Sequence, residues 1–288
     1  MTGPRVTVGI PVFNMERTVA RAIESVLGQT LGDFELLVSD NASSDGTEEI
    51  CRRYAAADAR IRYTRHPRAI PGLENFRFVL DAARGAYFMW LAADDFMLSR
   101  LLEEATAILD RHPDVVCSTP RVDALDRDGR RRPLPGTFAL LGRPRQNLYR
   151  YLRDPLDNSR FYGVYRREAL QPALPAAAYY GFDWVVVAST LRQGKHAELA
   201  EVLLVREESD PEKYMRFNDV AGGLSRLFPL ARCTRALLFD LRLLPTPCLL
   251  YALLRINVIH HVMYSRYRFP RYGRVAHRLG MRLRRLGV

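Results

Sequence analysis

Short apolar runs that suit buried strands alternate with amphipathic segments that suit helices along the first 122 residues. The helical segments gather their apolar residues on one stripe, as Val19, Ile23 and Val26 do. This alternation predicts an α/β fold with a mostly parallel sheet covered by helices on both faces. The expected strands cover 6–12, 34–39, 61–65, 87–91 and 114–122, and the expected helices cover 16–29, the second part of 43–55, 73–85 and 98–112. Gly85 is expected to be the C-cap of the helix 73–85, and residues 129–136 (GRRRPLPG) are expected to form a polar, turn-rich loop.

The acidic pair Asp94–Asp95 follows the apolar run YFMWL (87–91) after only two alanines. Ligands of parallel α/β sheets bind beyond the carboxyl ends of the strands, and Asp40, which follows the second expected strand, falls there too. Two adjacent carboxylates are costly in such a place unless a cation, hydroxyls or backbone N–H groups contact them. The pair therefore indicates either a cation site or a solvated loop in which one aspartate caps the next helix.

The chain has neither a GxGxxG loop after a strand nor a GxxxxGK[ST] loop, the two common phosphate-binding loops. A nucleotide bound at this sheet would need another source of positive charge for its phosphates. Carboxylate oxygens select Mg²⁺ or Mn²⁺, and these ions bridge phosphate oxygens. Asp94 and Asp95 are therefore predicted to hold Mg²⁺ or Mn²⁺ that carries a diphosphate.

Three blocks of the sequence resemble the family 2 glycosyltransferases, which have the GT-A fold and use nucleotide sugars. The blocks are IPVFNMERTVARAIESVLGQT, FELLVSDNASSDGT and ARGAYFMWLAADD, and the resemblance covers about residues 5–205. It implies a Rossmann-like mixed sheet flanked by helices. It also implies an enzyme that moves a sugar, with inversion, from a nucleoside-diphosphate sugar to a hydroxyl acceptor.

The resemblance implies a set of donor-binding residues. Pro11 and Phe13 match the proline and the aromatic residue that line the nucleobase pocket in the family. Asp40 matches the aspartate that reads the edge of the base. Asn75, in the expected helix 73–85, is also assigned to donor binding.

The acidic block matches the family's site for ribose and metal-bound diphosphate, so Asp94 is expected to contact the donor, and Asp94 and Asp95 the metal. The acidic residue that usually stands two positions before Asp94 is Ala92 here, so the metal should rest chiefly on Asp95. Where family members often carry Arg-x-His, residues 206–208 read Arg-Glu-Glu, and the histidine is absent.

An inverting transfer needs a carboxylate to take the proton of the acceptor hydroxyl as its oxygen attacks the sugar. Family members place this base at the start of a helix, as the second residue of Glu-Asp. The matching segment, YYGFDWVVVASTLRQGK, has Phe182 at the first position and Asp183 at the second. Asp183 is therefore predicted to be the catalytic base, and the alternative that it only caps its helix stays open.

The C-terminal part of the chain is strongly basic. The formal net charge is +11, and residues 264–288 carry eight arginines and no acidic residue, after apolar segments with scattered basic residues. Basic clusters beside apolar amphipathic helices are typical of a membrane-surface anchor, so we expect binding to anionic membranes and a lipid-linked or other glycan acceptor. A solvated basic face is the second interpretation and nucleic-acid binding the third, and no nucleic-acid partner is predicted.

These patterns predict a transferase domain over 1–215, divided into a nucleotide-binding half (1–122) and an acceptor half (123–215), with a basic amphipathic helical extension over 216–288. No signal segment, membrane-spanning apolar run or CxxC spacing is evident, so we expect a cytoplasmic protein at the inner membrane face. Two alternatives are a nucleotidyltransferase that makes sugar nucleotides, disfavoured by the missing phosphate loop, and a non-catalytic nucleotide-binding membrane scaffold, which would not need Asp183.

Overall fold

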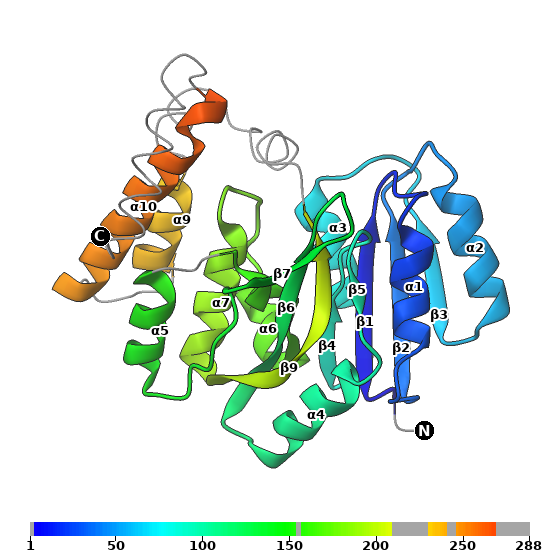
Figure 1. Cartoon of the computed structure of the whole chain (residues 1–288), viewed down its shortest axis with the longest axis horizontal. Helices are drawn as coiled ribbons and strands as arrows, with labels where there is room; N and C mark the ends of the chain where they lie inside the picture. Colours follow the sequence, from blue (N-terminus) through cyan, green and yellow to red (C-terminus); the bar gives the residue numbers. More distant parts are fainter. Residues whose placement is uncertain (1–2, 154–156, 209–229, 241–245, 269–288) are drawn as a thin grey trace.

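The computed structural model describes residues 3–153, 157–208, 230–240 and 246–268 (Figure 1). The strands within these ranges are β1 (Val6–Val12), β2 (Phe34–Asp40), β3 (Ile61–Arg65), β4 (Tyr87–Trp90), β5 (Phe96–Met97), β6 (Val115–Leu125), β7 (Arg131–Leu134), β8 (Val164–Arg166) and β9 (Lys195–Glu207). The α-helices are α1 (Val19–Leu27), α2 (Thr47–Ala57), α3 (Gly72–Asp81), α4 (Leu101–Arg111), α5 (Pro144–Arg153), α6 (Arg167–Leu170), α7 (Phe182–Gln193), α9 (Ala231–Arg235) and α10 (Pro247–Arg268). Short helical turns are η1 (Ser159–Tyr162), η2 (Gln171–Ala173) and η4 (Ala236–Asp240).

A single mixed sheet forms the centre of the described structure. Its strand order is β3-β2-β1-β4-β8-β6-β9-β5, and β7 pairs with β6 at the side. The strands β3, β2, β1 and β4 are parallel, as expected from the alternating sequence. The short strand β8 then pairs antiparallel with both β4 and β6, and β6 pairs parallel with β9. The carboxyl ends of β1, β2 and β4 therefore meet at one edge of the sheet.

Strand β4 shows why both faces of the sheet are covered. Its side chains alternate between the faces, so Phe88 and Trp90 pack in a cluster with α3, α5 and α7, while Tyr87 and Met89 pack with α1 and α4. All four side chains are buried. A strand buried on both faces reads as a continuous apolar run, which is the pattern that the sequence carries at 87–91.

The C-terminal helices share an apolar core with α5 and α7. Helix α10 packs on α5, and α9 packs on α7, at the end of the molecule remote from β3 (Figure 1). Leu253 and Ile256 of α10 belong to the same apolar cluster as Leu148 and Tyr151 of α5, and Arg255 donates to the carbonyl oxygen of Arg153. The predicted boundary at residue 215 and the arginine-rich segment 269–288 lie outside the described residues.

A second apolar face of α10 is exposed. Among the described residues, no helix is both long and apolar enough to cross a bilayer. Four apolar side chains of α10 are exposed, and we call them the α10 stripe: Leu250, Tyr251, Leu254 and Val258. Leu250, Leu254 and Val258 follow one another at intervals of four residues, about one helical turn, and Tyr251 is next to Leu250.

Two local expectations are wrong. The helix expected over 73–85 ends at Asp81, and Gly85 is not its C-cap. Gly85 instead lies against β1, where a Cβ atom would stand 2.6 Å from the backbone nitrogen of Thr7, so only glycine permits this approach. Residues 129–136 were expected to form a loop, but Arg131–Leu134 form β7 along β6.

Candidate active site

The acidic pair lies in the turn between β4 and β5. Asp95 is 2% exposed, and its Oδ1 atom accepts a hydrogen bond from the backbone N–H of Glu207 at 3.0 Å. Its Oδ2 atom lies 3.3 Å from Nε of Arg206, near the end of β9. Asp94 is half-buried, and its carbonyl oxygen accepts a hydrogen bond from Arg21 at 2.6 Å. The turn is therefore joined to both β9 and α1.

The charge of Asp95 depends on its surroundings. Burial, together with the neighbouring charge of Asp94, raises the pKa of this carboxyl to about 7, although the charge of Arg206 and the hydrogen bonds from Arg206 and Glu207 oppose the rise. Burial lowers the pKa of Arg206, but the nearby Asp95 outweighs that effect and the net shift is upward. Arg206 therefore remains a cation in the site, whereas Asp95 ionises near neutral pH.

Arg206 also reaches toward the predicted base. Nη1 of Arg206 donates to Oγ of Ser159 at 3.2 Å, and the guanidinium lies over the ring of Tyr162 at 4.7 Å. Asn158 precedes Ser159, and its Nδ2 atom donates to Oδ2 of Asp183 at 2.7 Å. The structure thus brings Asp95 and Asp183, which are far apart in the sequence, close to one cation, Arg206, whose charge acts on both carboxyls.

Asp183 occupies the first turn of α7. The N-cap position is held by Gly181, whose φ of 80° is in the left-handed region that favours glycine. Burial raises the pKa of Asp183, while the hydrogen bond from Asn158, the first-turn backbone N–H groups and the charge of Arg206 oppose the shift. Asp183 is therefore not the N-cap residue, although its carboxylate benefits from the N-terminal end of the helix.

Asp40 and Phe13 lie at the carboxyl ends of β2 and β1. The side chain of Asp40 is fully buried, accepting hydrogen bonds from the backbone N–H of Ser43 at 2.8 Å and from the hydroxyl of Tyr63 at 2.7 Å. The Nε atom of Arg65 lies 3.6 Å from it. Phe13 is 49% exposed, which leaves a ring free to contact a ligand. The base-reading role of Asp40 stays a prediction.

Asn75 and Pro11 both lie near Ser39. Asn75 of α3 is buried, its Oδ1 atom accepts from the Ser39 hydroxyl at 2.6 Å, and its Nδ2 atom donates to the Ser39 carbonyl at 3.0 Å. The ring of His66 lies 3.2 Å from the same Oδ1 atom. Pro11 is the β1 partner of Ser39 and is half-buried. Asn75 therefore holds α3 to the end of β2, and the donor-binding roles of Asn75 and Pro11 stay predictions.

The acidic pair suits a cation that the donor helps to bind. Within the described ranges, no group of three or more histidine, cysteine, aspartate or glutamate side chains is placed to hold a metal ion. Mg²⁺ commonly takes one or two protein carboxylates and completes its shell with phosphate oxygens and water. A carboxylate offers about four lone-pair directions, and Asp95 shares two hydrogen bonds with the protein. Asp94 and Asp95 thus fit a diphosphate-bound cation better than one held by protein alone.

Sequence reasoning missed the residues that connect the site. Arg206 drew notice only as part of a motif that lacks its histidine, yet it contacts Asp95 directly. Asn158 and Ser159 lie in a segment with no recognisable pattern, and Tyr151 reads as an ordinary apolar position on α5. The one available signal was a positive charge directly after the apolar run VLLV (202–205), at Arg206.

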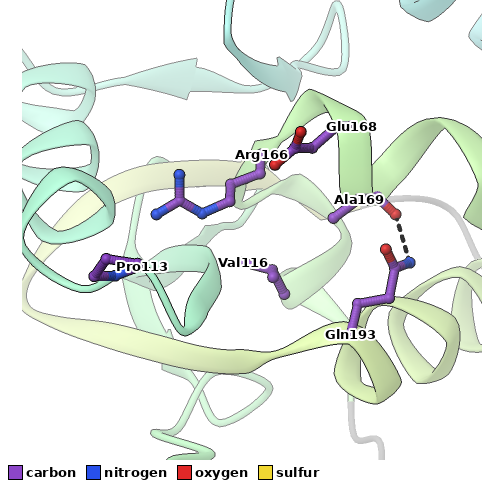
Figure 2. Close-up of a pocket in the computed structure, with 6 residues that line it drawn as sticks. All are labelled: Pro113, Val116, Arg166, Glu168, Ala169 and Gln193. Atoms are coloured by element: carbon purple, nitrogen blue, oxygen red, sulfur yellow. Dashed lines mark hydrogen bonds between the residues drawn. The ribbon is translucent and has the colours of Figure 1, made fainter.

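A hollow of about 520 Å³ lies elsewhere, between the start of β6 and the end of α7 (Figure 2). It is at the opposite end of these strands from Arg206, because Val115 pairs with Lys195 there while Arg206 pairs with Ala124. Its prominent cation, Arg166, donates to the carbonyl oxygens of Val115 at 2.9 Å and Leu109 at 2.6 Å. The lining contains none of the predicted site residues, so the hollow is not part of the candidate active site.

Comparison with known sequences gives consistent matches. The family model described as "Glycosyl transferase family 2" matches residues 7–173. The putative glycosyltransferase EpsE of Bacillus subtilis (strain 168) is 36% identical over 112 residues, which are 38% of this chain and 40% of the relative. A GalNAc(5)-diNAcBac-PP-undecaprenol beta-1,3-glucosyltransferase of Campylobacter jejuni is 34% identical over 100 residues, which are 34% of this chain and 32% of the relative. The matches span less than half of each relative.

Solved structures resemble the chain over most of its length. S. aureus TarS 1-349 in complex with UDP-GlcNAc gives a TM-score of 0.58 at 16% identity, covering 98% of this chain and 92% of that one. The mannosyltransferase PcManGT from Pyrobaculum calidifontis, in complex with GDP-Man and Mn²⁺, gives 0.51 at 17% identity, covering 93% and 76%. These similarities confirm the expected GT-A fold.

Proposed function

Because the chain belongs to glycosyl transferase family 2, we propose that it is an inverting enzyme that moves a sugar from a nucleoside-diphosphate sugar to a hydroxyl acceptor. The observation that carries this proposal is the placement of Asp95 and Asp183 around Arg206, which pairs with Asp95 and whose charge also acts on Asp183. It joins a site suited to a diphosphate with a carboxylate suited to deprotonate an acceptor. The nucleotide sugars bound by structures of the same fold support this choice of donor.

Asp183 is the proposed general base. Its ionised carboxylate takes the proton of the acceptor hydroxyl while the hydroxyl oxygen forms a bond to the anomeric carbon. The bond between that carbon and the diphosphate oxygen breaks on the opposite side, so the configuration inverts. The half-buried position limits the solvation of the carboxylate, and burial therefore moves its pKa upward, toward the range useful for a base at neutral pH.

Arg206 is proposed to balance the negative charge that grows on the leaving diphosphate. Its guanidinium is largely buried, with 20% of the side chain exposed, so its charge is less screened than that of a surface arginine. Mg²⁺ or Mn²⁺ held by Asp94 and Asp95 would supply further positive charge to the same phosphates. Asp95 and Ser159 orient Arg206 through hydrogen bonds to its guanidinium.

The donor nucleobase is proposed to lie near the carboxyl ends of β1 and β2. The exposed ring of Phe13 is available for stacking, with Pro11 beside it in the strand. Asp40 and Asn75 are proposed to shape and read this pocket, because they fix the chain at the ends of β2 and β3.

We also propose that the protein binds an anionic membrane surface at the inner face of the membrane and uses a lipid-linked or other glycan acceptor. The α10 stripe supports this proposal, together with the exposed Arg232 and Arg235 of α9. We retain the division into a transferase domain (1–215) and an extension (216–288) as part of the proposal. The described part of the extension packs on the acceptor half.

The stereochemistry of the product tests the proposed reaction. UDP-GlcNAc and GDP-mannose, both α-linked donors, would be offered with a panel of lipid-linked and free sugar acceptors, and the new anomeric proton followed by NMR. A β-linked product is expected, and an α-linked product would overturn the inverting mechanism.

In the Asp183→Asn variant, transfer should fall about 10²–10⁴-fold while donor affinity stays near that of the unmodified protein. Full transfer by this variant would remove Asp183 as the base.

A further inference from the structure

Asn158 is held in an unusual local conformation beside the proposed base. Its φ of 50° and ψ of 32° lie in the left-handed region, which asparagine tolerates better than most residues. The residue is 3% exposed. This backbone conformation directs the carboxamide between α5 and the first turn of α7, where it makes two hydrogen bonds.

The two ends of the Asn158 carboxamide have different partners. Its Oδ1 atom accepts a hydrogen bond from the hydroxyl of Tyr151 at 2.7 Å, and its Nδ2 atom donates to Oδ2 of Asp183 at 2.7 Å. Tyr151 is fully buried in α5. A phenol that donates to the amide oxygen leaves the NH₂ group pointing to Asp183, and an NH₂ group can only donate. The amide therefore favours the ionised carboxylate over the protonated one.

Several charged or titratable groups surround Asp183. Arg206 of β9 attracts its negative charge. Tyr151 of α5, Tyr162 of η1 and Cys233 of α9 also face it, and burial raises the pKa of each of the three, so they stay neutral around pH 7. Asn158 is the neutral side chain that donates to Asp183 directly. It is therefore the group whose removal should change the ionisation of Asp183 without changing the net charge of the site.

We propose that Asn158, oriented by the hydroxyl of Tyr151, is a positioning residue that fixes the Asp183 carboxylate and holds it ionised for proton transfer. The proposal rests on the function proposed above, in which Asp183 is the base. Tyr151 acts through Asn158 and not on the substrate. The unit draws its members from α5, the turn before η1 and α7, so it also ties three elements of the acceptor half together.

Titration of Asp183 tests this unit without any ligand. Carboxyl carbons of ¹³C-labelled aspartate would be followed by NMR in the full-length protein, with Asp183 identified from its missing signal in Asp183→Asn. In Asn158→Gly, which suits the left-handed backbone but lacks the amide, we expect the midpoint to rise by about one to two pH units, the effect of losing a hydrogen bond to a charged group. Asn158→Asp should raise it at least as much, and Tyr151→Phe should raise it less.

A matched control separates positioning from general damage to α5. Asn147 is also buried, and its carboxamide bonds only the backbone of Gly142 among the contacts described for it. Asn147→Ala should lower the melting temperature but leave the Asp183 midpoint in place. An unmoved midpoint in folded Asn158→Gly, or an equal shift in Asn147→Ala, would overturn the inference.

The rate of transfer gives the second readout. The product assay identifies the donor and the acceptor, so that kcat can be measured as a function of pH. In Asn158→Gly, the acidic limb of this pH profile should move to higher pH, while the donor dissociation constant stays unchanged. A limb that does not move refutes the positioning role. If Asp183→Asn is fully active but the NMR midpoint shifts as expected, the proposed base is wrong and the Asn158 contact is real, so the two failures are distinguishable.

Discussion

Nε of Arg206 lies 3.3 Å from Oδ2 of Asp95, so a cation near the end of β9 partners the buried carboxylate that follows β4. The two residues are 111 positions apart in the chain. Their contact places a permanent positive charge beside the predicted diphosphate site, in a chain that lacks the histidine often found at this point in its family.

Replacing Arg206 by alanine should destabilise the protein because it leaves Asp95 buried without its cation. Breaking a buried pair costs about 3–5 kcal/mol of unfolding free energy. The loss should be larger at pH 8 than at pH 6. Burial already raises the pKa of Asp95 in the folded protein, and a carboxyl without its partner takes up a proton more readily at the lower pH. Denaturant titrations at both pH values measure this difference.

Arg132→Ala is the matched control for Arg206→Ala. Arg132 pairs with Glu208, but 60% of its side chain is exposed, so the change should cost less than about 1 kcal/mol at either pH. Equal losses for the two variants would mean that the Arg206–Asp95 pair contributes no more than a surface ion pair.

Asp95→Asn should abolish the part of nucleoside-diphosphate affinity that depends on Mn²⁺. Asparagine keeps an oxygen for the N–H of Glu207 but lacks the charge that a divalent cation requires. Calorimetric titrations with UDP and GDP, with and without Mn²⁺, make the measurement. Asp114→Asn, an exposed change beside Lys195 at the start of β9, serves as control. If Mn²⁺ strengthens binding equally in folded Asp95→Asn, the cation is held elsewhere.

Asp40→Ala should weaken donor binding and leave the rate of the bound complex nearly unchanged, because the nucleobase is remote from the reacting carbon. Tyr63→Phe provides the comparison, since it removes the hydroxyl that donates to Asp40 but keeps the carboxylate. If Asp40 reads the base, Tyr63→Phe should retain donor affinity. If both variants lose affinity in proportion to their loss of stability, Asp40 only supports its loop.

The double variant Leu250→Glu, Leu254→Glu should reduce binding to vesicles that contain phosphatidylglycerol. These side chains are 48% and 65% exposed on the α10 stripe, and the new charges would be costly at an apolar interface. Cosedimentation at low and high salt measures the effect, and salt should weaken binding of the unmodified protein. Leu141→Glu, at a site 51% exposed outside α9 and α10, should bind normally. Unmodified protein that ignores such vesicles at low salt would contradict the membrane proposal.

Local patterns predicted the parallel half of the sheet well. The run at 87–91 became β4 because a strand buried on both faces has to be apolar throughout, and Val6–Val12 and Ile61–Arg65 formed with the expected bounds. Strand β5 has only two residues and depends on pairing with Leu204 and Val205, so no local sequence pattern predicts it. The end of α3 was misplaced because Gly85 serves close approach to β1 rather than a helix cap.

The candidate site was predictable only where a residue stands at the end of a strand or a helix. Asp40, Asp95 and Asp183 all occupy such positions, and the folded chain places them there. Asn158 owes its position to a left-handed turn and to a phenol seven residues earlier on another element. Its contact with Asp183 joins residues 25 positions apart, and no periodic pattern in the sequence predicts such a contact.

The packing of α10 on α5 affects the order in which parts of the protein can fold during synthesis. The strands β1 to β4 pair with one another, although Phe88 and Trp90 of β4 also pack with residues of α5 and α7. The cluster around Tyr151 also needs Leu253 and Ile256, which leave the ribosome about 50 residues after Arg206. At about 5–20 residues per second, that delay is roughly 3–10 s. The nascent chain would thus have synthesised all of its parallel strands while the surroundings of Asp183 still await α10.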